Sequence, residues 1–334
     1  MTSQILSEYL RIRSIPQLRA IVDKFEEGRD GSLPFQGEWV HRIDFLIAEP
    51  LTSPDLIPRL LRRTPNLIIY VNRMGGDFRP EAQTPSAVLE ALAKYCGSSL
   101  RRIEWSGEAP TYYDLANLSP QAPSLETISL GLIPHPIDTV VELPRTWDPL
   151  LARLAEHPEA LPALRRVEVD VFPMDLGFFH AHGAKIRVFR TMNWSTPPML
   201  PSALPLMPNL DSLILTQSTE YVTLPPAHPA LRRICVAPFM GEHIVVPPRF
   251  FASAVLTPLD SVLLSIDSTK LPCLEEVRLR NIGILDNLVH EPAWLLKWAR
   301  RWHFRGVRFC DMRGRSFGEV EDPNNDPLLD LVRG

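Results

Sequence analysis

The chain has 334 residues, and its shares of hydrophobic (45%) and charged (22%) residues are those of an ordinary globular protein. Its formal net charge of −4 excludes the strongly basic composition of many nucleic-acid-binding proteins. The length exceeds what one ordinary core needs, so either two domains or an elongated repeat fold is expected. The 34 prolines, roughly twice the usual share of about 5%, are scattered along the chain, which indicates that they punctuate structure.

The cysteines stand far apart and form no Cys-x-x-Cys pair: Cys96, Cys235, Cys273 and Cys310. This spacing favours buried reduced thiols over a disulfide framework or a zinc site. No apolar run approaches the ~20 residues that span a bilayer, and the start, MTSQILSEYLRIRS, lacks the apolar core of a secretory signal. We therefore expect a cytoplasmic or nuclear protein without a membrane partner.

One short phrase recurs along the chain, with apolar residues at offsets 0, +3 and +5. After a strand-like segment, YLRIRS, eight clear copies and two weaker ones (the second and the sixth) begin at Val40, Leu67, Leu100, Leu125, Leu164, Ile186, Leu210, Leu231, Leu274 and Phe304. The last two apolar positions lie two residues apart, so both point to one face of a β-strand. Consecutive copies begin 21 to 43 residues apart, which suits one supersecondary unit per copy rather than a hairpin.

Helical periodicity fills the intervals between these strands. Residues 16–28 and 84–97 carry apolar residues at helical spacing, and residues 148–158 and 291–304 repeat the design. The residues expected to face inward are Leu18, Ile21, Val22 and Phe25 in the first segment and Val88, Leu89, Leu92 and Tyr95 in the second.

A proline opens most copies of the phrase, as in MPNLDSLIL and LPCLEEVRL. Proline cannot continue a helix, and it pushes the preceding residue towards extended geometry. We therefore expect a common role, the end of one return segment and the start of the next strand, for Pro65, Pro123, Pro162, Pro208, Pro229 and Pro272.

Strand and helix units of this size bury their apolar faces only when they stack. The sequence therefore predicts an α/β fold, an irregular leucine-rich-repeat-like solenoid over residues 1–315 with about ten to eleven units. Its parallel sheet forms the concave face and its helices the convex face, and residues 316–334 form a poorly ordered tail. The asparagine usual at offset +8 is replaced by Glu108, Ile133, Phe172 and Ser218, so we expect an uneven arc.

Four segments carry a family resemblance: YLRIRSIPQLRAIVDKFE, WVHRIDFLIAEP, LLRRTPNLIIYVNRMGG and YCGSSLRRIEWSG. They resemble the leucine-rich region of basidiomycete (mushroom-type) fungal F-box proteins, and the likeness covers roughly residues 9–315. In that family an F-box lies upstream and docks on the Skp-type adaptor of a cullin-type ubiquitin ligase, while the repeats select the substrate.

Only eight residues precede Tyr9, so the F-box is expected to be missing from this sequence. Two functions remain open. One is a protein-interaction scaffold without an F-box. The other is a ligase substrate receptor whose F-box lies outside the sequence. The chain as written should capture a Skp-type adaptor only if an F-box exists upstream.

Catalytic signals are weak. The chain contains no Gly-x-Ser-x-Gly, no Gly-x-Gly-x-x-Gly and no phosphate-binding loop. His180 and His182 stand two apart, which suits two metal ligands only on an extended strand, whereas their surroundings predict a helix end or loop. Trp294, Trp298 and Trp302 recur every four residues, which favours an apolar cap over the last repeats rather than an aromatic peptide groove. We expect no enzyme activity, cofactor or metal.

The informative surface is the one that the strands turn away from the core. If offsets 0, +3 and +5 face the core, offsets +2 and +4 face the concave surface. The charged candidates for partner binding there are Arg102, Glu104, Arg166, Glu168, Arg190, Arg233, Glu276, Arg278 and Arg308. Such a mixed surface suits a protein partner with its own charge pattern and not a nucleic acid. We expect a monomer that binds an unspecified protein, and a melting temperature that survives alanine at Arg102, Arg166 and Arg233.

Overall fold

The computed structural model describes residues 8–27, 36–47, 53, 55–72, 86–105, 120–130, 148–169, 175–192, 199–216, 223–237, 256–279, 292–311 and 313–317. The chain divides into two compact units, Met1–Ile186 and Arg187–Gly334. Both units are α/β, and the eleven described strands are divided between them. The continuous repeat domain expected over residues 1–315 stays a prediction.

The first unit alternates short strands with helices. Its elements are β1 (Tyr9–Ile12), α2 (Ile15–Glu27), η2 (Gln36–Trp39), β2 (Arg42–Phe45), α3 (Leu56–Leu61), β3 (Ile69–Asn72), α4 (Ser86–Ala91), η3 (Leu92–Cys96), β4 (Arg102–Trp105), β5 (Thr127–Leu130), α6 (Asp148–Ala155), β6 (Arg166–Val169), α7 (Gly177–His182) and η4 (Gly183–Lys185).

The second unit follows the same plan. Its elements are β7 (Val188–Met192), α8 (Leu200–Ala203), η5 (Leu204–Leu206), β8 (Ser212–Thr216), β9 (Arg233–Ala237), α10 (Thr257–Ser268), β10 (Glu276–Leu279), α12 (Pro292–Phe304) and β11 (Arg308–Cys310).

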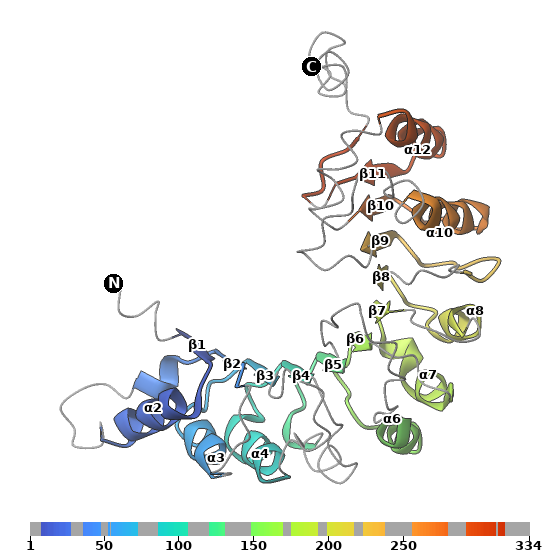
Figure 1. Ribbon diagram of the computed structural model, residues 1–334. Helices are drawn as coiled ribbons and strands as arrows, with labels where there is room; N and C mark the ends of the chain where they lie inside the picture. The colour runs from blue at the N-terminus through green and yellow to red at the C-terminus, as the bar shows by residue number, and fades with distance from the viewer. Residues whose placement is uncertain are drawn as a thin grey trace. The chain divides into compact units, whose positions relative to one another are not determined.

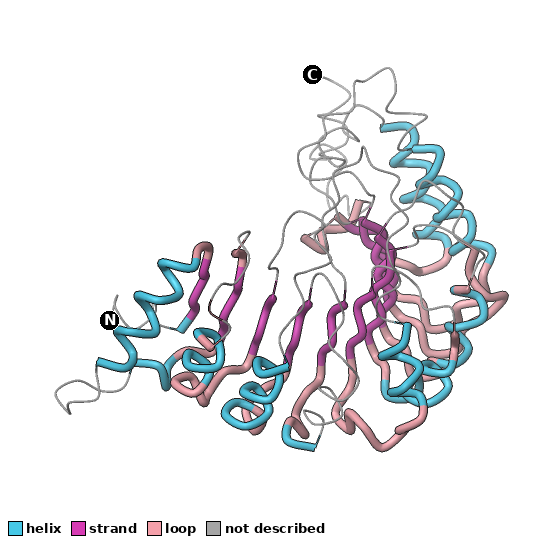
Figure 2. The backbone as a smooth tube through the Cα atoms, turned by 60° about the horizontal axis from the view of Figure 1, so that its bottom comes forward, coloured by secondary structure: helices cyan, strands magenta, loops and turns pink. Residues whose placement is uncertain are grey.

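The described strands of each unit pair in chain order and in parallel: β1 to β6 in the first unit and β7 to β11 in the second. They lie side by side in Figure 2, and the described helices of each unit lie on one side of its strands (Figure 1). Parallel neighbours need a crossover connection, which the intervening segments supply. The predicted α/β fold with a parallel sheet is confirmed.

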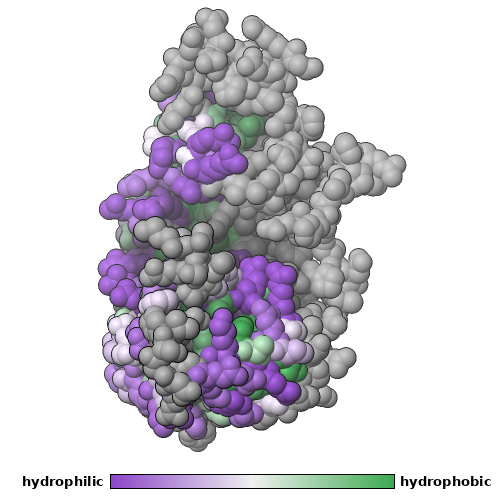
Figure 3. Space-filling view, turned by 90° about the vertical axis from the view of Figure 1, so that its left-hand side faces the viewer, coloured by the Kyte–Doolittle hydropathy of each residue, from purple (hydrophilic) through white to green (hydrophobic). Residues whose placement is uncertain are grey.

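The predicted phrase sets the register of the strands. Its +3 residues align across the first unit, from Ile43 through Tyr70 and Ile103 to Val167. Nine of the ten residues predicted to open a copy are at most 7% exposed: Val40, Leu67, Leu100, Leu125, Leu164, Ile186, Leu210, Leu231 and Leu274. On the side that Figure 3 shows, the described surface is mostly hydrophilic, with small apolar patches between.

Three core assignments from the sequence are wrong. Ile21 of α2 is only half-buried, whereas Leu18, Val22 and Phe25 are buried as expected. Phe304 is 88% exposed because α12 continues to that residue, and the chain then turns through Gly306 at φ +68°. Trp302, two residues earlier on α12, is buried instead, and its carbonyl accepts the Val307 N–H at 3.0 Å. In the predicted helix 84–97, Tyr95 is only half-buried while Cys96 is buried, because η3 is a π-helix and its wider turn shifts the inward face by one residue.

The prolines that open the phrase sit inside β-turns. At Pro65, the Leu67 N–H donates to the Thr64 carbonyl at 3.2 Å, so proline takes the second turn position, where its fixed φ is favourable. The same i to i+3 bond recurs at Leu125, Leu164, Leu210 and Leu274. Each turn ends at a buried leucine that lies just before the next strand, which explains why Pro-x-Leu recurs.

The predicted tryptophan row is buried between α10 and α12. Trp294 is 9% exposed, and Trp298 and Trp302 are fully buried. The indole N–H groups of Trp294 and Trp298 both donate to Asp260 Oδ1, at 2.9 and 2.6 Å. Further along α10, Asp267 accepts hydrogen bonds from Arg301 and Arg305. The row therefore belongs to the core of the second unit.

A side chain occupies the C-terminal end of the outer edge of β1. The Glu8 and Ile12 carbonyls accept the N–H groups of His41 and Leu46, which flank β2, so the Arg11 carbonyl and the Arg13 N–H point to the other side. Gln17 of α2 donates Nε2 to the Arg11 carbonyl at 3.0 Å and accepts the Arg13 N–H at 2.8 Å. These are the two bonds that one residue of a neighbouring parallel strand would make.

The outer edge of β11 is closed by backbone. Cys310 bridges Ser316 in antiparallel fashion, and the Phe317 N–H donates to the Phe309 carbonyl at 2.8 Å. Asp311 holds the intervening turn by accepting the N–H groups of Arg313 and Arg315. Ser316 and Phe317 are thus part of the fold, whereas residues 318–334 and the expected repeat positions Glu108, Ile133, Phe172 and Ser218 lie outside the described residues. Within the described part of the chain, no helix has the length and apolarity to cross a membrane.

Candidate functional site

The strand face opposite the helices is the candidate site, and we call it the open face. In the first unit its side chains come from alternate strand positions, because neighbouring residues of a strand point to opposite faces. They are Tyr9, Arg11, Arg42, Asp44, Ile69, Val71, Arg102, Glu104, Thr127, Ser129, Arg166 and Glu168. The open face of the second unit carries Arg190, Arg233, Glu276, Arg278 and Arg308.

Charged pairs two residues apart define the open face of the first unit. Arg42 donates Nε and Nη2 to the two carboxylate oxygens of Asp44, at 2.8 and 3.1 Å. The Tyr9 hydroxyl donates to Asp44 Oδ2 at 2.5 Å, and the Arg42 guanidinium lies 5.1 Å from the centre of the Tyr9 ring. The hydrogen bond to Asp44 raises the pKa of Arg42 above its ordinary value. This cluster holds one guanidinium in a fixed position.

The next two pairs repeat the arrangement and are linked to each other. Arg102 Nε donates to Glu104 Oε1 at 2.6 Å, and Arg166 Nε donates to Glu168 Oε1. Arg102 Nη2 also lies 3.7 Å from Glu168 Oε1, across β5. The small Thr127 and Ser129 of β5 stand between the two pairs and leave room for this reach.

Burial separates the two charges of each pair. Glu104 is 6% exposed and Glu168 is fully buried, whereas the side chains of Arg102 and Arg166 are 30% and 31% exposed. The sequence treats all four as partner contacts of equal rank. In the structure the acids lie beneath the arginines and orient them, so the guanidinium groups are the more exposed part of each pair.

The same geometry changes one expectation about stability. The sequence predicts that Arg102 and Arg166 can be replaced by alanine without cost to folding. Each of them neutralises a buried carboxylate, and a buried charge that loses its partner is strongly destabilising. We therefore expect that alanine at either position lowers the stability of the first unit.

The open face of the second unit has more arginines than acids. Glu276, 4% exposed, accepts Arg278 Nε at 2.8 Å through Oε1 and Arg308 Nη2 at 2.7 Å through Oε2. Arg233 lies in register with Glu276, is 56% exposed, and has Asp211 Oδ2 at 3.9 Å. Arg190 lies on β7 in register with Ile214 of β8. One buried carboxylate therefore anchors two of the arginines here.

The histidines singled out by the sequence have structural roles. Both lie on α7, where two-residue spacing points them apart: His180 is exposed and His182 is fully buried. His182 Nε2 donates to the Leu154 carbonyl at 2.9 Å, and Lys185 Nζ donates to His182 Nδ1 at 3.1 Å. Burial lowers the pKa of His182, so the imidazole is a neutral link between α6 and α7.

His228 plays a related part in the second unit. Its Nε2 donates to the Met207 carbonyl at 3.1 Å, and its Nδ1 accepts the Leu231 N–H at 3.2 Å. At this copy of the phrase the imidazole nitrogen thus takes the place of the turn carbonyl found elsewhere. The sequence HPALRRICV shows a histidine before the proline, which is the signal that could have revealed this role.

These two histidines predict a loss of stability in mild acid. Burial lowers the pKa of each histidine in the folded chain below the ordinary value of 6.5 that it has in the unfolded chain. At a pH between the folded-state and unfolded-state pKa values, the unfolded chain therefore binds more protons than the folded one. Their contribution is complete above pH 6.5 and is lost as the pH falls through the lowered pKa. We expect the melting temperature to fall as the pH drops below about 6.5, and His182→Gln/His228→Gln to flatten that fall. An unchanged slope in thermal unfolding of the double variant would contradict this assignment.

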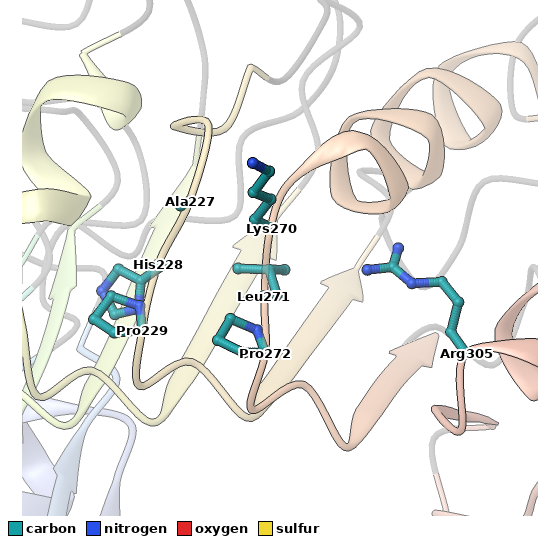
Figure 4. A pocket seen from close by; sticks show the side chains of 7 residues that line it. All are labelled: Ala227, His228, Pro229, Lys270, Leu271, Pro272 and Arg305. Atoms are coloured by element: carbon teal, nitrogen blue, oxygen red, sulfur yellow. The ribbon is translucent and has the colours of Figure 1, made fainter.

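A shallow depression with a volume of about 510 Å³ lies in the second unit and is open to solvent. Three segments that precede β9, β10 and β11 line it: Ala227–Pro229, Lys270–Pro272 and Arg305 (Figure 4). Two of its polar side chains already have partners, since His228 bonds to Met207 and Arg305 bonds to Asp267. The side chain of Lys270 is exposed. The depression brings no general acid and base together.

The cysteines agree only in part with the expectation of buried thiols. All four are free, and Cys96 and Cys310 are buried. Burial raises the pKa of Cys96 to about 12, which makes this thiol unreactive. Cys235 is half-buried and Cys273 is exposed, because Cys273 occupies the third position of a proline turn at the surface.

Among the described residues, no group of three or more His, Cys, Asp or Glu side chains could hold a metal ion. Comparison of the chain with protein-family models and with curated proteins finds no match to either. The open face, with its anchored arginines, is therefore the feature of the described residues on which a function can be argued.

Proposed function

We propose that this protein is a non-enzymatic protein-interaction scaffold, a leucine-rich-repeat-like solenoid that resembles the substrate-recognition region of F-box proteins. The observation that carries the proposal is the set of part-exposed guanidinium groups on the open face, each held by a buried carboxylate. Arginine is enriched among the residues that dominate protein interfaces, and its planar fork matches carboxylates.

Anchoring makes these arginines better suited to binding than ordinary surface arginines. A free arginine loses side-chain entropy when a partner immobilises it, and this loss weakens binding. Asp44, Glu104, Glu168 and Glu276 have already fixed their arginines before a partner arrives. Such pre-organisation suits a surface selected for recognition.

The test is a quantitative affinity pull-down with three forms of the chain. The open-face variant carries Arg102→Gln, Glu104→Gln and Arg233→Ala, so that no carboxylate is left without its arginine in the first unit. The control carries Arg101→Ala and Arg232→Ala, which remove exposed arginines next to the same strands. Mass spectrometry should show proteins retained by the wild type and the control but depleted from the open-face variant. Identical sets of proteins from all three forms would contradict the proposal.

A further inference from the structure

The arginines of the open face in the first unit form one row. Arg42 pairs in register with Ile69, Ile69 with Arg102, Arg102 with Thr127, and Thr127 with Arg166. Arginine therefore occupies the same position on β2, β4 and β6, with an uncharged residue on each strand between. Neighbouring strands lie about 4.8 Å apart, so successive arginines of the row are about 9.6 Å apart.

The guanidinium groups have hydrogen-bonding capacity for a ligand. Each carries five N–H donors, of which the bonds described above use one or two. The three side chains are 40%, 30% and 31% exposed. Their own acids cancel most of the net charge, so recognition depends on short, directed bonds rather than on long-range attraction.

The spacing selects one backbone conformation for a carboxylate-bearing ligand. A polyproline II helix has three residues per turn and rises about 3.1 Å per residue, so every third side chain points the same way and recurs every ~9.3 Å. A β-strand places residues three apart on opposite faces. An α-helix repeats its face every seven residues, or ~10.5 Å, and its mismatch grows along the row.

We propose that the open face of the first unit binds an acidic segment of a partner protein in the polyproline II conformation, with a carboxylate at every third residue. The inference rests on the proposed function and names the chemistry of its partner. Arg42, Arg102 and Arg166 each receive one carboxylate, while Ile69 and Thr127 face the residues between. The second unit shows the same interval, since Arg233 of β9 and Arg308 of β11 align through Glu276 of β10.

Synthetic peptides test the spacing without any change to the protein. The probe is a fluorescein-labelled peptide of three Glu-Pro-Pro repeats, and the control has the same composition with its three glutamates adjacent. A third peptide carries glutamine in place of glutamate. Titration with the full chain, followed by fluorescence anisotropy, should give a dissociation constant about tenfold lower for the repeat peptide than for the adjacent one, and no binding of the glutamine peptide.

Variants then assign the binding to the row. Arg102→Gln with Glu104→Gln should lower the affinity for the repeat peptide about tenfold, without leaving a charged and unpaired Glu104. Arg102→Lys should lower this affinity less, because lysine keeps the positive charge but lacks the planar fork of donors of a guanidinium group. Arg101→Gln, at an adjacent exposed arginine paired with Glu126, should leave the affinity unchanged.

The outcomes separate this inference from the proposed function. Equal affinity for the repeat and adjacent peptides, lost alike in the Arg102 double variant, would overturn the spacing and keep the interaction role. Tighter binding of a helical peptide with glutamate every seven residues, or of a single-stranded oligonucleotide, would overturn the proposed ligand. A partner protein that depends on Arg102 while neither glutamate peptide binds would overturn it as well.

Discussion

Leu213→Asp should abolish the native structure of the second unit. Leu213 is the second residue of β8 and is fully buried, in register with Phe189 of β7 and Ile234 of β9. A carboxylate there has no partner and faces the apolar core, so we expect a loss of about 4 kcal/mol or more in unfolding free energy. That loss approaches the whole margin of a marginal domain. Circular dichroism during thermal unfolding measures it.

Leu264→Asp is the matched control for that change. Leu264 lies on α10 of the same unit and is 48% exposed, so its carboxylate remains partly in water. The control should lose much less stability than the core variant. If Leu213→Asp unfolds at the temperature of the wild type, Leu213 does not face the core and the strand register is wrong.

Arg166→Ala should destabilise the first unit by about 2 kcal/mol. The value lies below the ~3–5 kcal/mol for a fully buried pair because Arg166 is 31% exposed and Arg102 also lies near Glu168. Chemical denaturation of the variant measures the loss. Arg165→Ala, which removes an exposed neighbour, should stay within about 0.5 kcal/mol of the wild type.

A double replacement shows whether the cost comes from Glu168. Arg166→Met with Glu168→Met removes both charges, so it should recover much of the stability lost in Arg166→Ala. Equal destabilisation by the single and the double change would mean that Arg166 acts through packing alone. A single variant as stable as the wild type would mean that Glu168 is hydrated.

The strands were predictable from the sequence because their signal is local and repeated. Buried residues at offsets 0, +3 and +5 recur in nine of the ten copies, and a parallel strand needs no long-range information to choose its inward face. The same counting misplaced Phe304, whose helix runs on past the point where the phrase should begin. Nothing in residues 292–307 marks the helix end except Gly306, which follows it.

The pairs of the open face were only half predictable. The sequence places Arg102 and Glu104 on one face, and the repeated Arg-x-Asp or Arg-x-Glu of β2, β4 and β6 could have indicated that they pair. Which charge is buried depends on how the side chains pack against the small residues of the neighbouring strand β5. Strand periodicity alone does not reveal this packing. The sequence therefore predicts the face but does not show that Glu104 and Glu168 are its buried members.

Gln17 has a consequence for how this protein behaves in concentrated solution. An uncovered strand edge is a template for pairing with other chains, and it is a common route to aggregation. One amide from α2 occupies two backbone groups on the outer edge of β1, the Arg11 carbonyl and the Arg13 N–H. In the second unit, Ser316 and Phe317 cover β11. Each contact occupies backbone groups through which another chain could pair, which disfavours filament growth from these two strands.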